Sequence, residues 1–504
     1  MKARTIPLAA ASLTLIVHAA GNPHYGFFRD ELYFIICGFH PAWGYVDQPP
    51  VVPLLAAGSQ LFGHSLFLLR LIPALFAAAG AYVTCVFAAE LGGKPFAQVV
   101  AALAYAFAGV LMSFGTKVGP DMVGLWLWPL CALYVLRIAR GGDPRLWLAA
   151  GAVAGVSLES KYSVLFFAVA ILTGLLLTPQ RRILGTGWFV AGMALAAAVA
   201  LPNFAWQAMH GFPMMELLRN GQNGKNVVAG PGLYLFQQLL LTNLFLSPIW
   251  IVGLIWLLRD GTARFLGYTY VVLIALMVVF HGKHYYPGDV YPILMAAGGV
   301  AVEALVAARF AWVRAPLVAA MIPAGLFFLP FSLPVLPEPA MLRYSQWVAG
   351  ALHLSKSTMA TEHHQSSALP SDWADMHGWP ELARTVARVY DALPPRQRAA
   401  AAIVTSNYGE AAAIDFFGPA YGLPPALSGH NNYWLWGTHG ASGDVIVDVN
   451  GDCGASRNLF RASHLAATFD APWVISYEHD APIMLCTGIR EPLAGLWPSL
   501  RRYI

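Results

Sequence analysis

Residues 66–90 read LFLLRLIPALFAAAGAYVTCVFAAE, an apolar run in which Arg70 and Glu90 are the two charged side chains. A helix needs about 20 mostly apolar residues to cross a bilayer, so this stretch predicts a membrane span. Ten further stretches have a similar character. The sequence therefore predicts a polytopic α-helical membrane protein with about eleven transmembrane helices, at 5–21, 66–90, 96–114, 122–138, 146–159, 161–178, 186–205, 232–258, 265–281, 289–308 and 315–334.

The composition of the whole chain leads to the same class. Of its 504 residues, 58% are hydrophobic and 11% are charged, whereas soluble domains carry about 25% charged residues. A soluble enzyme of this size is therefore excluded. Five cysteines are too few for a disulfide scaffold. A net charge of +4 is too small to indicate nucleic-acid binding, so the expected surrounding partner is the lipid bilayer.

The apolar pattern changes near residue 338, and no run of span length follows Pro339. We expect residues 1–338 to form the transmembrane domain and residues 339–504 to form a soluble α/β domain. In the second region the pattern predicts helices at 379–393 and Tyr408–Phe417. It also predicts strands at Ala400–Thr405, Asp444–Val449 and Trp473–Ser476.

Basic residues gather in alternate short loops of the first region, including Lys2 and Arg4 before the first span. Because cytoplasmic loops are rich in Lys and Arg, the N-terminus is predicted to be cytoplasmic and residues 339–504 extracytoplasmic. Lys2 and Arg4 also fit a cleavable signal, although we favour a retained first helix. An oxidising compartment favours pairing of Cys453 with Cys486. The alternative is two unpaired thiols.

The first predicted outer loop, residues 22–65, contains HYGFFRDELY at residues 24–33. Its adjacent Asp30 and Glu31 follow the first span closely, at the height of the lipid phosphates. Ionisable residues at a membrane face are costly and are functional candidates. A carboxylate there can take a proton from an acceptor hydroxyl beside a lipid-linked donor. The alternative is a solvated loop carboxylate or a helix N-cap.

A series of short motifs extends this loop. RDELY at 29–33, GYVDQPP at 44–50 and LRLIPAL at 69–75 resemble the family 39 membrane glycosyltransferases. These are relatives of the protein O-mannosyltransferases and of the lipid A aminoarabinose transferase, in the C superfamily. The resemblance continues through GPD at 119–121, ESKY at 159–162 and KHYY at 283–286, so it covers about residues 20–300.

The resemblance implies a GT-C fold and an inverting sugar transfer from a polyprenyl-phosphate donor. The transfer would occur at the outer face of the bacterial cytoplasmic (inner) membrane, to an acceptor in the cell envelope. It also implies that Asp30 acts as, or positions, the general base. Glu31 would be its neighbour in the family's acidic pair, and Asp121 would be a second carboxylate.

The expected leaving group is a lipid phosphate, which is already stable as an anion. Such a reaction needs cations near the phosphate and no general acid. Cations on the predicted outer side are Arg70, Lys117, Lys161 and Lys283, which we expect to bind the phosphate. The remaining residues of the same motifs are expected to line the substrate pocket, namely Asp47, Tyr162, His284, Tyr285 and Tyr286.

Several of these residues have structural alternatives. Lys161 fits a snorkelling lysine at a helix end, and Arg70 and Lys283 fit anchors at the membrane interface. The histidines of the outer loops match no metal signature, so no metal or other cofactor is predicted, with a divalent ion left as an alternative.

A transporter or flippase is the competing function, because it would also have many spans and buried charges. Transporters usually show related halves and polar sites near mid-membrane. This sequence shows no internal repeat, and its charges lie at one face. Mannose, an aminopentose and a uronic acid all fit as the sugar. The acceptor candidates are lipopolysaccharide, a cell-wall glycan, a lipid and a protein.

Overall fold

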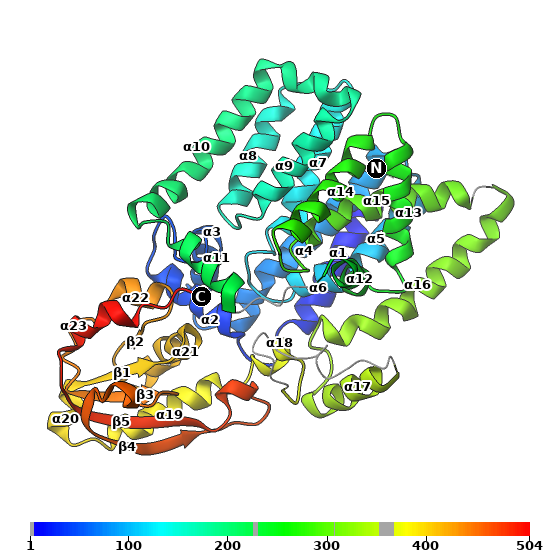
Figure 1. Cartoon of the computed structure of the whole chain (residues 1–504). Helices are drawn as coiled ribbons and strands as arrows, with labels where there is room; N and C mark the ends of the chain where they lie inside the picture. The colour runs from blue at the N-terminus through cyan, green and yellow to red at the C-terminus, as the bar shows by residue number, and fades with distance from the viewer. Residues whose placement is uncertain (1–4, 225–229, 307, 352–366) are drawn as a thin grey trace.

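The computed structural model describes residues 5–224, 230–306, 308–351 and 367–504, so Lys2 and Arg4 lie outside the described residues. A bundle of helices forms the larger part, and the C-terminal residues form a smaller domain against one end of it (Figure 1). The helices of the larger part are α1 (Thr5–Gly21), α2 (Arg29–Phe39), α3 (Val51–Ser59), α4 (Leu66–Glu90), α5 (Pro95–Ala106), α6 (Gly109–Phe114), α7 (Gly124–Ala139), α8 (Leu146–Leu158), α9 (Val164–Leu176), α10 (Gly187–Met209), α11 (Pro213–Gly224), α12 (Pro231–Leu241), α13 (Ser247–Arg259), α14 (Arg264–Val279), α15 (Tyr291–Leu305), α16 (Arg314–Phe328) and α17 (Glu338–Ala351).

The described residues contain several apolar spans, but fewer helices reach the length of a membrane span than the eleven that the sequence predicts. Four helical segments are long and apolar enough to cross a membrane: Leu66–Glu90, Gly187–Met209, Gly288–Leu305 and Phe310–Phe331. A fifth arises if α9 and the short 3-10 helix η2 (Pro179–Gly185), which meet at 114°, are counted as one span. The other apolar helices of the bundle have 10–17 residues.

Two predicted spans are shorter because the chain breaks inside them. The predicted span 96–114 divides into α5 and α6, and the predicted span 232–258 divides into α12 and α13. The two breaks face each other. Asn243, in the left-handed backbone region at φ 71°, donates from its side-chain amide to the carbonyls of Phe107 and Ala324 at 3.3 and 3.0 Å. A carbonyl freed by one helix break is thus satisfied by the residue at the other, as a polar group in an apolar bundle requires.

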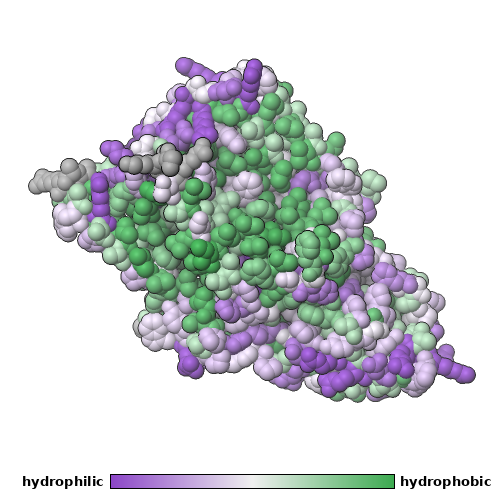
Figure 2. All heavy atoms as spheres, turned by 180° about the vertical axis from the view of Figure 1, so that it is seen from behind, coloured by the Kyte–Doolittle hydropathy of each residue, from purple (hydrophilic) through white to green (hydrophobic). Residues whose placement is uncertain are grey.

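The surface has the distribution expected of a membrane-embedded bundle. Figure 2 shows a broad band of hydrophobic residues across the bundle, with hydrophilic residues at its two ends and over the soluble domain. Large apolar side chains that are exposed on the helices of the bundle include Val190, Leu201, Val271, Ile322 and Leu326. In water such a surface would be a large apolar patch, so the band indicates contact with lipid.

The C-terminal domain is built on one mixed five-stranded sheet. Its strands lie in the order β2-β1-β3-β5-β4, with β1 parallel to β2 and β3, and β5 antiparallel to β3 and β4. The bounds are β1 (Ala401–Thr405), β2 (Ala426–Ser428), β3 (Val445–Val449), β4 (Phe460–Phe469) and β5 (Ala481–Ile489), with helices α18 (Ser371–Ala374), α19 (Trp379–Asp391), α20 (Pro395–Ala400), α21 (Tyr408–Phe417), α22 (Asn432–Trp436) and α23 (Leu493–Leu496).

Most expected elements of this domain are present, and one prediction was wrong. Helices α19 and α21 and strands β1 and β3 occupy the expected places. The predicted strand at 473–476 is instead a loop that leads into a 3-10 turn, and Trp473 has a φ of 66°. A backbone in the left-handed region cannot continue a strand, so the apolar run there has another role. Trp473 packs beside a small buried cluster around Phe28 and Trp373.

One hydrophobic core joins the soluble domain to the bundle. On the sheet, alternate residues of β3 such as Val447 face the helices α19 and α21, as the two-residue period of a strand requires. On its other side α21 packs against α2, and Leu32, Ile35 and Ile36 of α2 belong to the same core. Helix α21 is therefore held between the sheet and α2, which fixes the soluble domain against the first outer loop.

Candidate active site

The first turn of α2 carries the acidic pair that the sequence singled out, and the two carboxylates have different surroundings. Glu31 points inward. It accepts a hydrogen bond from the backbone N–H of Phe28 at 2.9 Å and from that of Val118 at 3.0 Å. Its side chain also forms an ion pair with Arg70, at 2.9 Å, and both side chains are 0% exposed.

The other donors of Arg70 are used by the loop between α1 and α2. Its guanidinium donates to the carbonyls of Asn22 at 2.6 Å, Gly26 at 2.7 Å and His24 at 3.1 Å. Removing one member of such a buried pair leaves an uncompensated charge. The structure thus places Glu31 and Arg70 where they hold this loop to α4, and neither is among the residues that line the cavity beside α2.

A cavity of about 690 Å³ lies between the bundle and the soluble domain, beside the first turn of α2. Its lining combines two kinds of residue. The charged and polar side chains include Arg29, Asp30, Lys117, Asp121, Lys283, His284, Asp372, Asp375, Tyr408 and Tyr477. The apolar side chains include Val110, Phe114, Leu240, Leu241, Phe328 and Phe331, mainly from α6, α12 and α16.

Asp30 lines the cavity, and its side chain is 35% exposed. Its Oδ1 accepts a hydrogen bond from the Tyr408 hydroxyl at 2.8 Å and lies 3.7 Å from Nε of Arg29. As the second residue of α2, Asp30 is also near the positive end of that helix, which favours a carboxylate. Asp30 is therefore ionisable, accessible and held in place.

Arg29 connects Asp30 to the soluble domain. Its guanidinium lies 3.3 Å from Asp375 and also donates to the Tyr477 hydroxyl. Burial raises the pKa of Asp375 to about 7, although the Arg29 charge opposes that shift. Arg29 can approach so closely because Gly409 has no side chain: a Cβ there would lie 2.2 Å from Cγ of Arg29.

The lysines of the motifs pair with carboxylates around the same cavity. Lys161 forms an ion pair with Asp121, and its Nζ lies 4.4 Å from the centre of the Tyr286 ring. Asp121 lines the cavity, whereas Lys161 and Tyr286 stand behind it. Lys117 forms an ion pair with Asp372.

The remaining lining residues of the KHYY motif follow α14. Nζ of Lys283 lies 5.9 Å from the centre of the Tyr285 ring, which makes an edge contact with His284. Burial, with a smaller contribution from the Lys283 charge, lowers the pKa of His284, so this imidazole is neutral at pH 7. Lys283, His284 and Tyr285 all line the cavity, as expected of the pocket.

Asp47 and Tyr162 do not line this cavity. Asp47 accepts hydrogen bonds from the Tyr33 hydroxyl at 3.1 Å and from Asn431 at 3.4 Å. Tyr162 donates to Asn203 of α10. Asp47 thus ties the GYVDQPP segment to α2 and to Asn431, and Tyr162 is tied to α10.

The soluble domain supplies a part of the cavity that no motif of the sequence marks. Tyr408, Tyr477, Asp372 and Asp375 all line it. Burial, and then the Asp30 charge, raise the pKa of Tyr408 well above its ordinary value, so its hydroxyl stays protonated. The sequence marks Tyr408 only as the start of a helix behind the capping residue Asn407, because its contact with Asp30 spans 378 positions.

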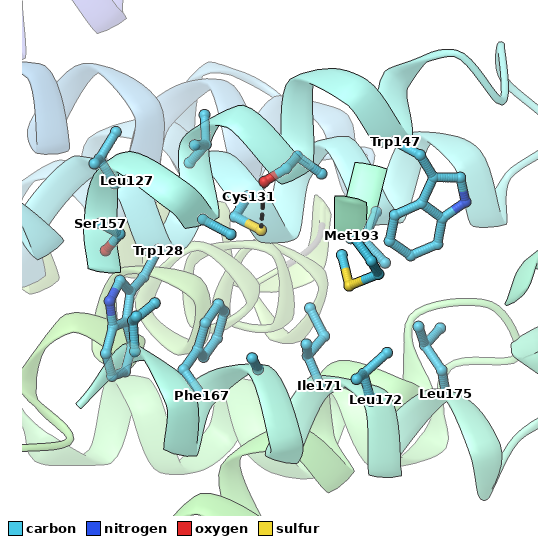
Figure 3. A pocket seen from close by; sticks show the side chains of 16 residues that line it. Leu127, Trp128, Cys131, Trp147, Ser157, Phe167, Ile171, Leu172, Leu175 and Met193 are labelled. Carbon is cyan, nitrogen blue, oxygen red and sulfur yellow. Dashed lines mark hydrogen bonds between the residues drawn. The ribbon is translucent and has the colours of Figure 1, made fainter. Parts of the chain in front are cut away.

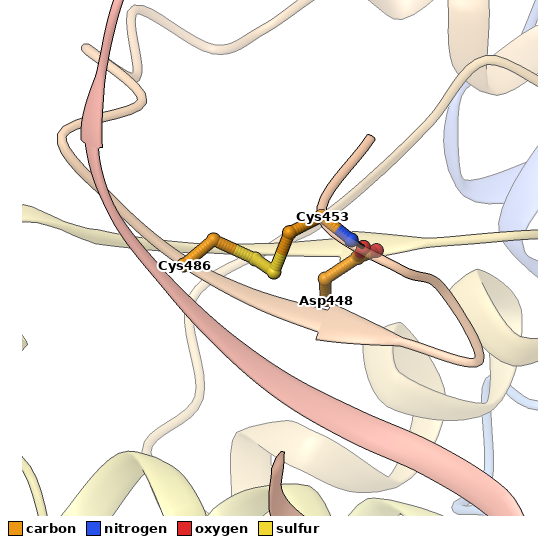
Figure 4. A group of neighbouring side chains, drawn as sticks. All are labelled: Asp448, Cys453 and Cys486. Atoms are coloured by element: carbon orange, nitrogen blue, oxygen red, sulfur yellow. Dashed lines mark hydrogen bonds between the residues drawn. A yellow bond between two sulfur atoms is a disulfide. The ribbon is translucent and has the colours of Figure 1, made fainter. Parts of the chain in front are cut away.

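Two groups of side chains in the described ranges are close enough to share a metal ion, and neither includes a residue of the cavity. Asp448, Cys453 and Cys486 form the first. Figure 4 shows that its two cysteines are joined, as the sequence predicted, so their sulfurs are not free thiolates for a metal. Asp448 accepts the backbone N–H of Cys453 at 2.8 Å. The second group, Asp470, His479 and Asp480, is fully exposed.

A second pocket lies inside the bundle between α7, α8, α9 and α10. Figure 3 shows its lining, which includes Trp128, Cys131, Phe167 and Met193. The surface that lines it is apolar throughout. Because it offers no group for acid–base chemistry or phosphate binding, the candidate active site is the cavity beside Asp30.

Comparisons with known proteins agree with this description. The profile of the dolichyl-phosphate-mannose-protein mannosyltransferase family matches residues 47–206. The chain is 28% identical over 186 residues to the lipid A galacturonosyltransferase RgtD of Rhizobium johnstonii, which covers 36% of this chain and 39% of that protein. The match thus spans about two fifths of the length of this curated relative.

The fold is also that of solved structures. Crystal structures of ArnT from Cupriavidus metallidurans, one bound to undecaprenyl phosphate and one in the apo state, superpose with a TM-score of 0.59 at 15% identity. The superposition covers 95% of this chain and 97% and 96% of the two ArnT chains. The chain is therefore similar over residues 47–206 to the dolichyl-phosphate-mannose-protein mannosyltransferases and has an ArnT-like fold, which confirms the resemblance that its motifs predict.

Proposed function

We propose that this chain is an inverting glycosyltransferase that moves a sugar from a polyprenyl-phosphate donor to a hydroxyl of a cell-envelope acceptor. The observation that carries the proposal is the mixed lining of one cavity. Its charged residues, with Asp30, Lys117 and Lys283, suit a sugar phosphate, and its apolar residues suit the first units of a prenyl chain. Both parts of an amphiphilic donor thus find complementary side chains in one space.

Asp30 is the proposed general base. A single displacement needs a base beside the acceptor hydroxyl and a stable leaving group. The acceptor proton passes to Asp30, the acceptor oxygen bonds to the anomeric carbon, and the carbon–oxygen bond to phosphate breaks with its electron pair on the phosphate. The configuration at the anomeric carbon is inverted, because attack comes from the face opposite the leaving group.

The phosphate is the proposed ligand of Lys117 and Lys283. Both lysines line the cavity, and charge-assisted hydrogen bonds to phosphate are among the stronger polar contacts. In the structure Lys117 is paired with Asp372, a carboxylate that is 52% exposed. A phosphate that binds Lys117 takes over this role from Asp372.

We place the reaction at the outer face of the bacterial cytoplasmic membrane, with the soluble domain extracytoplasmic. Support comes from the basic residues of the opposite loops and from the Cys453–Cys486 disulfide, which is typical of an oxidising compartment. A membrane-impermeant protease added to cells with a permeabilised outer membrane should cleave within residues 367–504. Complete protection of that region contradicts this orientation.

A transfer assay tests the function. Purified protein in lipid vesicles receives a polyprenyl-phosphate sugar labelled in the sugar, with lipid A as the first acceptor because RgtD is named for that acceptor. Galacturonic acid, aminoarabinose and mannose donors are compared in parallel. We expect label on the acceptor with the wild type and none with Asp30→Asn. Label that crosses the vesicle membrane without transfer would support a transporter instead.

A further inference from the structure

We propose that Tyr408 of the soluble domain is the residue that positions Asp30 for proton abstraction, so that the soluble domain is a working part of the active site. The inference rests on the proposed function of Asp30 as the base. Its structural basis is the 2.8 Å hydrogen bond from the Tyr408 hydroxyl to Oδ1 of Asp30, inside the cavity that both residues line.

The orientation of Tyr408 is fixed by its neighbours. Its ring lies between those of Tyr33, with centres 4.6 Å apart, and His430, with centres 4.7 Å apart. The Arg29 guanidinium lies 5.6 Å from the centre of the same ring. Tyr408 is 8% exposed, and contacts from α2 and from the loop around His430 leave its side chain little freedom to rotate.

The backbone of Tyr408 is held just as firmly. Tyr408 is the first residue of α21, and Asn407 before it caps the helix by accepting from the backbone N–H groups of Gly409 and Glu410 at 2.8 and 3.0 Å. The Glu410 carboxylate in turn accepts from the backbone N–H of Asn407 at 3.2 Å. This capping box satisfies backbone N–H groups at the start of the helix. The backbone position of Tyr408 is therefore fixed as well as the direction of its side chain.

These contacts indicate which oxygen of the Asp30 carboxylate accepts the proton. Tyr408 and Arg29 both engage Oδ1. Oδ2 is then the oxygen that takes the proton from the acceptor hydroxyl, and Tyr408 keeps the carboxylate plane from rotating as the proton arrives. A general base misplaced by about 1 Å loses a large part of its effect on the rate. A contact that positions the base therefore affects kcat.

Tyr408→Phe tests the inference, because it removes the hydroxyl and keeps the ring contacts. We expect kcat to fall roughly ten- to a hundredfold, in line with the loss of one hydrogen bond to a charged group, while KM for the donor changes less than about twofold. The matched control is Tyr433→Phe. Tyr433 also belongs to the soluble domain and donates to a carboxylate, that of Asp415, at 2.9 Å, but it does not line the cavity.

A measurement without turnover separates this inference from the proposed function. Carbodiimide labels accessible carboxyl groups, and peptide mass spectrometry follows Asp30 and Asp372 in the same sample. In Tyr408→Phe we expect Asp30 to be labelled several times faster and Asp372 at the wild-type rate. This result supports the positioning role even if the wild type transfers none of the sugars offered.

Three results would overturn the inference. The first is an unchanged labelling rate of Asp30 in Tyr408→Phe. The second is a kcat within about threefold of the wild type. The third is an equal loss of kcat in Tyr433→Phe, because an effect shared by both variants would be a general effect on the soluble domain. Protein yield and an intact disulfide in each variant establish that the comparison is made on folded protein.

Discussion

The cavity has two walls, and they differ in how visible they are in the sequence. The wall from the bundle carries Asp30, Lys117, Asp121 and Lys283, charged residues beside long apolar stretches. The wall from the soluble domain carries Asp372, Asp375, Tyr408 and Tyr477, which stand among many other polar residues. An ionisable side chain in a membrane segment is costly and therefore informative, whereas the same side chain in a soluble domain is ordinary. Functional residues of the bundle wall can therefore be recognised from the sequence, whereas those of the other wall become evident only in the structure.

The largest expected effect is on the wall from the bundle. Asp30→Asn keeps the size of the side chain and removes its ability to accept a proton. We expect the transfer rate to fall by a factor of about 10²–10⁴, the usual contribution of a general base, with normal protein yield. Initial rates of transfer to lipid A measure it. Retention of more than about a third of the activity would remove Asp30 from this role.

Replacement of the neighbouring carboxylate, Glu31, should reduce stability more than activity. Glu31→Gln leaves Arg70 buried without its anionic partner, and we expect a loss of roughly 3–5 kcal/mol in the free energy of unfolding. Activity per folded molecule should change less than in Asp30→Asn. Thermal unfolding in detergent, followed together with the transfer rate, separates the two quantities. A Glu31→Gln variant with full stability and no activity would exchange the roles of the pair.

Away from the cavity, the soluble domain should have a stability that depends on pH. Burial raises the pKa of Asp415 from 3.8 to about 6. A raised pKa means that the folded state binds the proton more tightly. The contribution of Asp415 to the free energy of unfolding is therefore complete below pH 3.8 and is lost as the pH rises through 6. The difference between the two pKa values corresponds to about 3 kcal/mol. The unfolding temperature of Asp415→Asn should therefore fall less between pH 4 and 7 than that of the wild type.

The smallest expected effects lie where the two walls meet, at the ion pair of Lys117 with Asp372. Lys117→Gln should weaken binding of polyprenyl phosphate about tenfold, because one charge-assisted contact is lost. Asp372→Asn should leave binding unchanged or tighten it by up to about threefold, because Lys117 no longer has a competing anion. Arg182→Gln, on an exposed basic loop, is the matched control. Weaker binding in Asp372→Asn would contradict the exchange of partners.

The sequence was sufficient for the features that depend on local pattern. The apolar stretches predicted the helical bundle, and hydrophobic alternation predicted β1 and β3. The disulfide between Cys453 and Cys486 was also predicted. The motif resemblance singled out Asp30 and Asp121, and the position of its charge singled out Lys117; all three line one cavity. The number of spans was not predictable in the same way, because an apolar run does not reveal a break whose carbonyl is satisfied by a distant residue such as Asn243.

Several candidate residues lie outside the cavity for a common physical reason. Asp47, Arg70 and Tyr162 belong to the same motifs as the cavity residues, and residue type does not tell which direction a side chain takes. Asp30 and Glu31 are adjacent, yet successive residues of a helix point about 100° apart. One faces the cavity and the other faces Arg70. The contacts from Tyr408 and Tyr477 depend on how two regions pack, so no window of sequence contains both partners.

The contact between Asp30 and Tyr408 also orders events during synthesis. The ribosome makes Asp30 first, and Tyr408 follows 378 residues later. During that interval Asp30 lacks one wall of its cavity, because residues 367–504 complete that wall only when they pack on α2. Under the proposed function, a nascent chain or a fragment cut before the final domain is therefore an incomplete catalyst, and full activity begins only when Tyr408 has reached Asp30.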